Sequence, residues 1–233
     1  LFTLALAGVI LLGTLLLATP WTTESGGRTP PVDALFTAVS AVAVTGLVTV
    51  DTQDHWNLFG EIVILLLIQV GGLGFFVGAS LVLQALRGGQ TRLNDRLLLQ
   101  QGDPTVSLRE TGRLIGRIIR FVFVVEGVGA MFLTAHFLQS KPFFEALWHG
   151  VFLAISGFCN AGFDLQGGFR SLTGQNTSIL VNVVMMLLIQ AGALSYLVLA
   201  DLFSRRRWSR LALGTQLVIF GHLFLLFVGA ALF

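Results

Sequence analysis

Charged residues are scarce in this chain: Lys, Arg, Asp and Glu make up 11% of its 233 residues, against about 25% in soluble domains. Hydrophobic residues make up 55%, and the mean hydropathy is +0.84. This composition excludes an ordinary soluble domain and indicates a protein whose solvent is the lipid bilayer. The single cysteine, Cys159, excludes an internal disulfide framework and is read as a small apolar residue.

Motifs of enzymes and metal sites are also missing. The four histidines are scattered without the spacing of a metal site. The GGLG run at residues 71–74 lacks the lysine, the hydroxyl residue and the preceding strand of a phosphate loop. We therefore predict no enzyme and no covalent cofactor. Because neither a Met start nor a basic stretch precedes Leu1, we expect no signal peptide and a chain that is a fragment or trimmed piece.

Several apolar runs are long enough to cross a bilayer as helices, which takes about 20 residues. They are residues 1–19, 60–86, 111–138, 177–203 and 211–233. Two further apolar stretches, residues 34–44 and 146–158, are too short to span and are predicted to be re-entrant helices. The polar residues 87–110 predict an aqueous linker. The pattern as a whole predicts an all-α transmembrane protein.

The order of these elements repeats along the chain. A shift of 116 residues pairs Thr45-Gly46-Leu47 with Ala161-Gly162-Phe163, and it also pairs Ser40 with Ser156. A shift of 121 residues pairs the LLIQ run that ends at Gln69 with the one that ends at Gln190, two residues before the glycines Gly71 and Gly192. Identities in two separate elements favour an internal repeat over chance similarity of apolar sequence.

The repeat gives the expected domain organisation. Repeat one would cover residues 1–86, with a first helix at 1–19, a re-entrant helix and turn at 34–48, and a second helix at 60–86. Repeat two would cover residues 111–203, with the same parts at 111–138, 146–164 and 177–203. Residues 87–110 would link them in the cytoplasm, and residues 204–233 would form a basic turn and the first helix of an incomplete third repeat.

The basic residues predict the orientation in the membrane. If residues 1–19 run from the cytoplasm outward, only Arg28, Lys141 and Arg170 fall outside, as the positive-inside rule requires. A basic inner face explains the pI of about 9.3 without nucleic acid, and Arg205, Arg206 and Arg207 are most simply topology and lipid-headgroup charges. We expect a multi-pass protein of a prokaryotic cell membrane.

Each predicted re-entrant helix ends in a glycine-containing turn, at Gly46 and at Gly162. Irregular backbone at membrane depth is tolerated only where protein buries it or water lines it. A glycine with positive φ turns successive carbonyls toward one axis, where carbonyl oxygens replace the hydration shell of a cation. The negative end of each short helix would favour the same charge. The two turns therefore predict a cation-conducting pore.

The sequence resembles a known family at these elements. DALFTAVSAVAVTGLVTVDT and LLLIQVGGLGFF look like the first pore repeat of the Trk/Ktr/HKT superfamily of potassium transporters, and AISGFCNAGFDL looks like the second filter region of the Ktr/Trk branch. RLLLQQ and VVEGVGA resemble the same branch. The resemblance implies tandem helix–pore helix–filter–helix repeats, four to a polypeptide, of which this chain holds two and part of a third. The chain departs from the family's usual Gly-Gly-Leu-Gly-like run at residues 190–196, which read QAGALSY.

The resemblance also implies function, site and partners. The expected activity is potassium uptake, with sodium permeation or coupling in some members. Gly46 and Gly162 match the filter glycines, and the matching positions whose carbonyls face the ion are Val44, Thr45, Asn160 and Ala161. K⁺, or also Na⁺, would be the transported ion at these residues. A homodimer, membrane lipid and a cytoplasmic nucleotide-binding regulatory subunit are the implied partners, and no nucleic acid is expected.

Three acidic residues outside the turns are further candidates. Glu126 lies deep in a predicted span, where an acid is either functional or held in an inter-helix contact, with Arg120 as one partner. Asp51 and Asp164 follow the two turns and either concentrate cations at the outer mouth or cap loops. Gln69 is expected to bond between helices, and glycines 71, 72 and 74 are expected to permit close packing rather than to act as hinges.

Two rival functions stay open from the residues alone. A secondary transporter with broken helices would couple its substrate to ions, but such folds often use inverted repeats, and the repeats here are parallel. A non-conducting half-chain with an assembly role is the other rival, because two filter turns do not close a pore by themselves.

Overall fold

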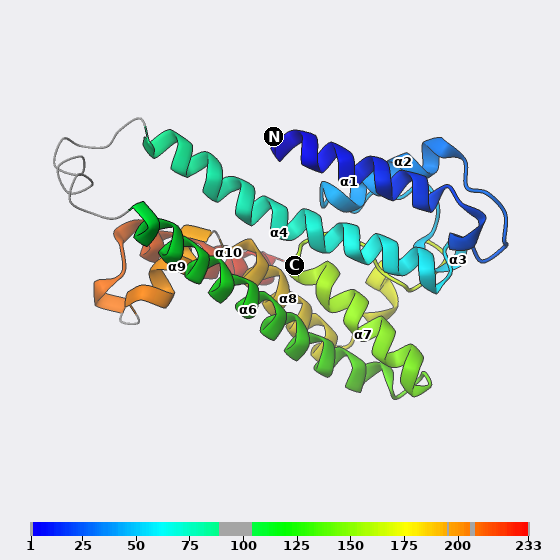
Figure 1. The fold of residues 1–233 in the computed structure, drawn as a ribbon. Coiled ribbons are helices and arrows are strands. Elements are labelled where there is room, and N and C mark those ends of the chain that lie inside the picture. The colour runs from blue at the N-terminus through cyan, green and yellow to red at the C-terminus, as the bar shows by residue number, and fades with distance from the viewer. Residues whose placement is uncertain (1, 89–103, 195, 206–207, 233) are drawn as a thin grey trace. The chain divides into compact units, whose positions relative to one another are not determined.

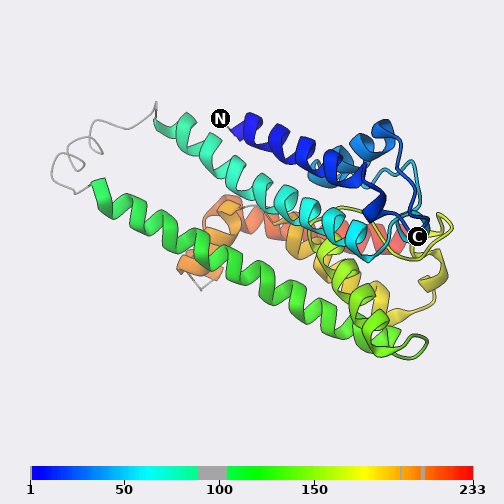
Figure 2. The same ribbon diagram turned by 45° about the vertical axis from the view of Figure 1, so that its right-hand side comes forward.

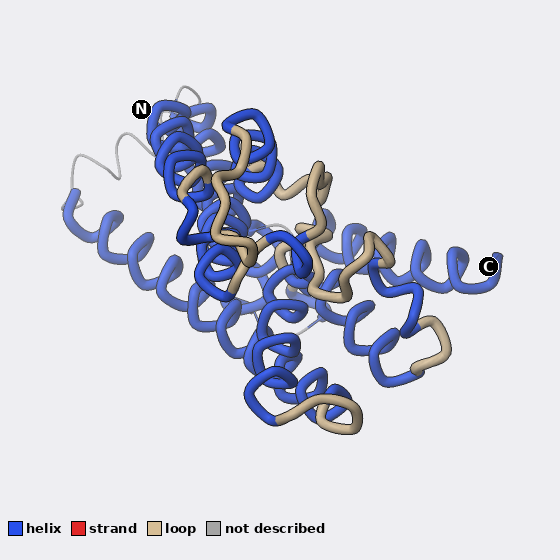
Figure 3. Tube along the Cα trace, turned by 90° about the vertical axis from the view of Figure 1, so that its right-hand side faces the viewer, coloured by secondary structure: helices blue, strands red, loops and turns tan. Residues whose placement is uncertain are grey.

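The computed structural model describes residues 2–88, 104–194, 196–205 and 208–232. All helices and turns of this part are drawn in Figure 3, which shows no strand among the described residues. The expected all-α class is thus found there. The chain divides into two compact units, Leu1–Gly78 with Phe121–Ala193, and Ala79–Arg120 with Leu194–Phe233. The predicted turns and acids all lie in the first unit.

The first unit begins with α1 (Phe2–Leu17), which lies alongside the first half of α4 (Leu58–Gly88) in both Figure 1 and Figure 2. Gly13 allows this approach, because a Cβ at this position would lie 2.7 Å from Leu67 Cδ1. The short helix α2 (Pro31–Val42) lies between them in the sequence, preceded by the 3₁₀ turn η1 (Pro20–Thr22) and followed by α3 (Thr52–His55).

The remainder of the first unit has the same order of elements. The C-terminal part of α6 (Pro104–Phe137) is followed by the short helix α7 (Phe143–Phe158), the 3₁₀ turn η2 (Ser171–Gln175) and α8 (Ile179–Ala193). Gly129 of α6 contacts the Leu188 side chain of α8 in the way that Gly13 contacts Leu67. A Cβ at Gly129 would lie 2.7 Å from Leu188 Cδ2. These glycine–leucine contacts fall at positions that the sequence alignment pairs.

The core of the first unit surrounds the short helices. Buried side chains from α1, α2 and α4 meet residues of α7 and of the turn after it, among them Leu17, Ala38, Ile64, Ile68, Phe152 and Phe163. Trp56, which is 1% exposed, closes this core beside α3. A buried core at this place fixes the ends of α2 and α7 against the longer helices.

The second unit contains α9 (Tyr196–Arg205), the 3₁₀ turn η3 (Trp208–Arg210) and α10 (Leu213–Leu232). The carboxylate of Asp201 accepts a hydrogen bond of 2.7 Å from the N–H of Ala212. The amide of Gln216 donates to the carbonyl of Trp208 over 2.9 Å. These bonds hold the turn between α9 and α10. Arg206 and Arg207 of the predicted basic turn lie outside the described residues.

Two helix boundaries in the structure differ from the expected ones. The second long helix of repeat two, expected at residues 177–203, ends at Ala193 as α8, and α9 begins at Tyr196. The stretch is mostly apolar, so its hydropathy did not predict the interruption, which falls within the QAGALSY segment at residues 190–196. At the expected linker 87–110, α4 continues to Gly88 and α6 begins at Pro104, where proline suits the first turn of a helix. Residues 89–103 lie outside the described part.

The lengths of the helices bear on the expected spans. Within the described residues, one stretch, Gly116–Phe137, is long and apolar enough to cross a bilayer by length and composition. The other expected spans correspond to shorter apolar helical stretches, which are Thr3–Leu17, Leu58–Gly74, Ile179–Ala193 and Leu213–Gly229. The number of crossings therefore remains a prediction.

Candidate functional site

The helix α2 ends in a closing turn that has two backbone hydrogen bonds. The N–H of Val44 donates to the carbonyl of Ala41 over 3.3 Å, and the N–H of Thr45 donates to that of Ser40 over 3.0 Å. This pair of bonds is the Schellman pattern, which requires a left-handed residue after the helix. Val44 occupies that position with φ of 57°.

The helix α7 ends in the same way. The N–H of Asn160 donates to the carbonyl of Gly157 over 3.1 Å, and the N–H of Ala161 donates to that of Ser156 over 2.8 Å. Asn160 is left-handed, with φ of 59°. Asparagine adopts this conformation readily, whereas it is a true outlier for a β-branched valine. Strain of this kind gathers at functional sites, which makes the Val44 turn a candidate site.

The glycines predicted for the filter are left-handed as well. Gly46 has φ of 72° and Gly162 has φ of 77°, two residues after Val44 and Asn160. The residue between each pair, Thr45 or Ala161, is not among the positive-φ residues. Each turn thus alternates left-handed and ordinary residues, an arrangement that points successive carbonyls to one side of the chain instead of to opposite sides as in a strand.

The two turns touch one another. A Cβ on Gly46 would lie 2.5 Å from the carbonyl oxygen of Ala161 and 3.0 Å from the Cα of Gly162. A cavity of about 140 Å³ adjoins this contact, and both glycines line it together with Asp51 and Asp164. The structure therefore brings together the two predicted turns and the two predicted mouth acids.

The carbonyl oxygens of these turns accept no hydrogen bond from the part of the chain that the structure describes. Among the described residues, none donates a hydrogen bond to the carbonyl of Val44, Thr45 or Gly46, nor to those at positions 160–162. Most of these residues are exposed or half-buried, and Ala161 alone is buried. Backbone carbonyls at membrane depth must be satisfied by protein, water or a bound ion. This row of free acceptors is a chemical feature that fits a cation.

The side chains of Thr45 and Asn160 point behind the turns. The hydroxyl of Thr45 donates to Ser40 Oγ over 3.0 Å. The amide of Asn160 is 3.3 Å from the carbonyl of Phe158 and 3.4 Å from that of Ile189 of α8. These long bonds place the amide of Asn160 on the helix side of the turn.

The carboxylate of Asp51 accepts hydrogen bonds from the backbone of two segments, the start of α3 and the loop at Phe169. Its Oδ1 accepts from the N–H of Gln53 and Asp54, which caps α3, and its Oδ2 accepts from the N–H of Phe169 over 2.6 Å. Asp54 likewise accepts from the N–H of Gly168 over 2.8 Å. Residues 167, 168, 169 and 171 all have positive φ, so this loop presents its N–H groups to the two carboxylates. The capping alternative thus describes the contacts of Asp51.

Asp164 faces the same cavity from the second turn. Its Oδ1 accepts from the N–H of Gln166 over 2.9 Å. Burial raises the pKa of the Asp164 carboxyl above its usual value, and the charge of Asp51 raises this pKa further, while the hydrogen bonds with Gln166 and Ser171 oppose the rise. Asp51 and Asp164 thus line the same cavity.

Glu126 lies elsewhere, in the contact between α4 and α6. Its side chain is 4% exposed, and its two oxygens accept from Gln69 Nε2 at 3.1 and 3.4 Å. The expected inter-helix bond of Gln69 is therefore present, and its partner is Glu126. For Glu126, the sequence had suggested Arg120 as one possible partner. Glu126 does not line the cavity at the turns.

Two glycines press the long helices against the ends of the short ones. A Cβ on Gly71 of α4 would overlap the carbonyl of Val42, and a Cβ on Gly192 of α8 would overlap that of Phe158. Val42 and Phe158 are the last residues of α2 and α7. Gly72 similarly faces Cys159 Sγ, at 2.5 Å from the position of a Cβ. The packing role expected for glycines 71 and 72 matches these contacts, whereas Gly74 has only an ordinary contact at 3.8 Å.

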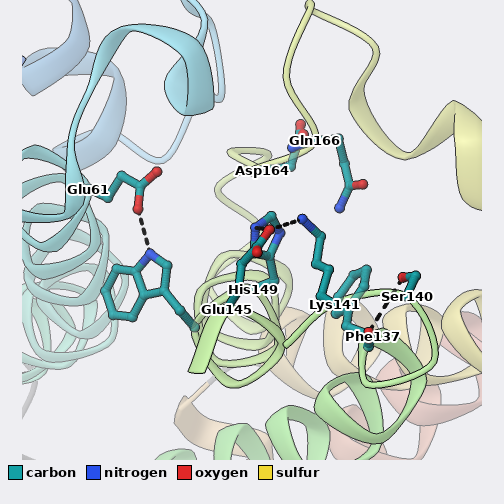
Figure 4. Close-up of polar contacts among 9 residues, drawn as sticks. Glu61, Phe137, Ser140, Lys141, Glu145, His149, Asp164 and Gln166 are labelled. Carbon is teal, nitrogen blue, oxygen red and sulfur yellow. Dashed lines mark hydrogen bonds and ion pairs between the residues drawn. The ribbon is translucent and has the colours of Figure 1, made fainter. Parts of the chain in front are cut away.

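Sequence reasoning missed one polar link between the α4 and α7 helices. Trp148 Nε1 donates to Glu61 Oε2 over 2.5 Å, and the Glu61 side chain is 4% exposed. Figure 4 shows Glu61 at one end of this bond, with Lys141 and Glu145 paired near His149 at the start of α7. The available signal in the sequence was Glu61, a lone acid at the beginning of an apolar run. Nothing in the sequence pattern indicates that Trp148 is its partner.

Comparison with known proteins agrees with these features. The model of the TrkH family, described as cation transport proteins, matches residues 9–226. The potassium/sodium uptake protein NtpJ of Enterococcus hirae is 35% identical over 225 residues, which cover 97% of this chain and 49% of that protein. The Ktr system potassium uptake protein B of Bacillus subtilis is 37% identical, over 93% of this chain and 47% of its own length.

A second Ktr system potassium uptake protein B, from Vibrio alginolyticus, is 33% identical over 99% of this chain and 50% of that protein. The chain thus spans about half the length of the curated relatives it matches. The matched family consists of membrane transporters and not of enzymes. From the match over residues 9–226, we conclude that this chain belongs to the TrkH family of cation transport proteins.

Proposed function

We propose that this chain forms part of a pore for potassium uptake, in which the ion passes along the turns at Gly46 and Gly162. The observation that carries the proposal is a row of carbonyls on two touching turns with matched left-handed residues, to which none of the described residues donates a hydrogen bond. Carbonyl oxygens arranged in this way replace the water shell of a potassium ion. The proposed ligands are the carbonyls of residues 44–46 and 160–162.

The charges around the turns support a cation as the transported species. Both α2 and α7 end at the turns, so the negative ends of their dipoles face the proposed ion. Asp51 and Asp164 add carboxylates on the cavity beside the two glycines. The described residues that line this cavity are acidic or neutral, and none of them is basic.

The complete protein is proposed to cross a prokaryotic cell membrane several times, with α1 running from the cytoplasm outward. Further filter turns beyond the two described would close the pore, as tandem repeats of this unit. We propose a homodimer and a cytoplasmic nucleotide-binding regulatory partner. The names of two relatives, which assign them to a Ktr system, support a multi-component assembly. The name of a third, which includes sodium, makes sodium permeation an outcome to be measured.

Rubidium and sodium flux in liposomes tests the proposal on the full-length protein. We expect selective rubidium uptake, and we expect Gly46→Ser and Gly162→Ser to lower the rubidium-to-sodium ratio about tenfold, because a left-handed serine costs roughly 1–2 kcal/mol. The serine at position 46 would also meet the Ala161 carbonyl.

Gly174→Ser is the matched control, since Gly174 has no positive φ and nothing lies within 4 Å of its Cβ position. An unchanged ratio in both filter variants, with wild-type amounts of folded protein, would remove the turns from the ion path. Equal rubidium and sodium flux in the wild type would leave a cation pore without potassium selectivity. Absence of any flux would favour an assembly role.

A further inference from the structure

A buried serine stands behind each turn at the same place on its short helix. Ser40 of α2 is 3% exposed and Ser156 of α7 is 2% exposed. Each gives its backbone carbonyl to the closing turn, as the acceptor for the N–H of Thr45 or Ala161. A serine inside a helix usually bonds the carbonyl four residues earlier. Here each hydroxyl instead makes a bond with the turn that follows its helix.

The two hydroxyls make different bonds. Ser40 Oγ accepts from the hydroxyl of Thr45 over 3.0 Å. The second turn has Ala161 in place of threonine, so Ser156 has no such partner. Ser156 Oγ reaches past the turn and donates to the carbonyl of Phe163, the residue after Gly162, over 2.5 Å.

This difference changes how many carbonyls each turn offers. The carbonyl of Leu47, the counterpart of Phe163, accepts no hydrogen bond from the described residues. The carbonyl of Phe163 is occupied by Ser156. The first turn therefore ends with one more free acceptor than the second, although their backbone conformations agree.

We propose that Ser40 and Ser156 are positioning residues that set the ion selectivity of the turns, with Ser156 holding the Phe163 carbonyl away from the ion. The inference rests on the proposed function of the turns. A turn released from its serine becomes less rigid, and its carbonyls can approach a smaller ion such as sodium. Neither serine contacts the ion in this account.

The test compares Ser156→Ala and Ser40→Ala in the full-length protein, with rubidium and sodium flux measured in liposomes. Each variant loses one hydrogen bond of a buried serine, so we expect the rubidium-to-sodium ratio to fall about fivefold. Ser140→Ala is the control, because Ser140 is an exposed loop residue whose hydroxyl donates to the nearby Phe137 carbonyl, and the flux ratio of this variant should stay at the wild-type value.

Thr45→Ala keeps the proposal testable if a buried alanine prevents folding, because Thr45 is exposed. Its loss frees Ser40 to bond the Leu47 carbonyl, as Ser156 does with Phe163. We expect Thr45→Ala to change the ratio, and Ser40→Ala added to it to reverse part of the change. If the wild type shows selective flux and the rubidium-to-sodium ratio is unchanged in Ser40→Ala, Ser156→Ala and Thr45→Ala, this inference alone is overturned. Absence of selective flux in the wild type would overturn the proposed function as well.

Discussion

Gly192→Ala is expected to destabilise the protein strongly and to abolish rubidium uptake. A Cβ at position 192 would overlap the carbonyl oxygen of Phe158, which is the last residue of α7. Because the new Cβ would meet a backbone atom and not a flexible side chain that can move away, α8 must separate from the end of α7. Overpacking of this kind costs about 1–3 kcal/mol or more. Gly71→Ala should act likewise, through the carbonyl of Val42.

Gly127→Ala in α6 gives a control with the opposite sign. Nothing lies within 4 Å of a Cβ at Gly127, so only helix propensity changes, and alanine should stabilise the helix by about 0.5–1 kcal/mol. Thermal unfolding of the purified full-length variants in detergent measures both effects. If Gly192→Ala unfolds at the same temperature as Gly127→Ala, the close contact between α8 and the second turn is not as described.

Gln69→Leu is expected to have the second large effect, through the buried Glu126. The carboxylate of Glu126 is 4% exposed and accepts from Gln69 Nε2 at 3.1 and 3.4 Å. Leucine removes this donor and leaves a buried acid without it, which costs roughly 3 kcal/mol or more. Because Gln69 lies on α4 and Glu126 on α6, the loss should loosen the contact between these helices and lower the unfolding temperature.

A double-mutant cycle separates this pair from unrelated damage. Replacement of both partners by apolar residues is often close to neutral, so Gln69→Leu with Glu126→Leu should be more stable than Gln69→Leu alone. Glu126→Gln keeps a side-chain acceptor for Gln69 and should behave nearly as the wild type. Strictly additive losses in the double variant would show that the two side chains do not interact.

The sequence predicted the parts of the fold that depend on length and local chemistry. Both short helices were expected because residues 34–44 and 146–158 are apolar and too short to span, and α2 and α7 contain them except for the residues just after α2. Gly46 and Gly162 were expected to have positive φ because glycine tolerates it, and both have it. The match of residues 9–226 to the TrkH family confirms the family that the filter motifs indicated.

Other features depend on tertiary contacts and left little trace in the sequence. Valine disfavours the left-handed conformation that Val44 adopts, so the sequence predicted a turn at Gly46 but not the conformation of Val44. Gln69 was expected to bond between helices, but which side chain it meets depends on how α4 and α6 are rotated. The end of α8 at Ala193 interrupts an apolar run, and the different bonds of Ser40 and Ser156 follow from one Thr45-to-Ala161 difference.

The location of a bound rubidium ion tests the central claim most directly. The measurement is anomalous diffraction from crystals of the full-length protein grown with rubidium in place of potassium. We predict a rubidium peak beside the contact of Gly46 and Gly162, surrounded by carbonyl oxygens of residues 44–46 and 160–162. No peak there, or rubidium held only by the carboxylates of Asp51 and Asp164, would contradict a carbonyl filter built from these turns.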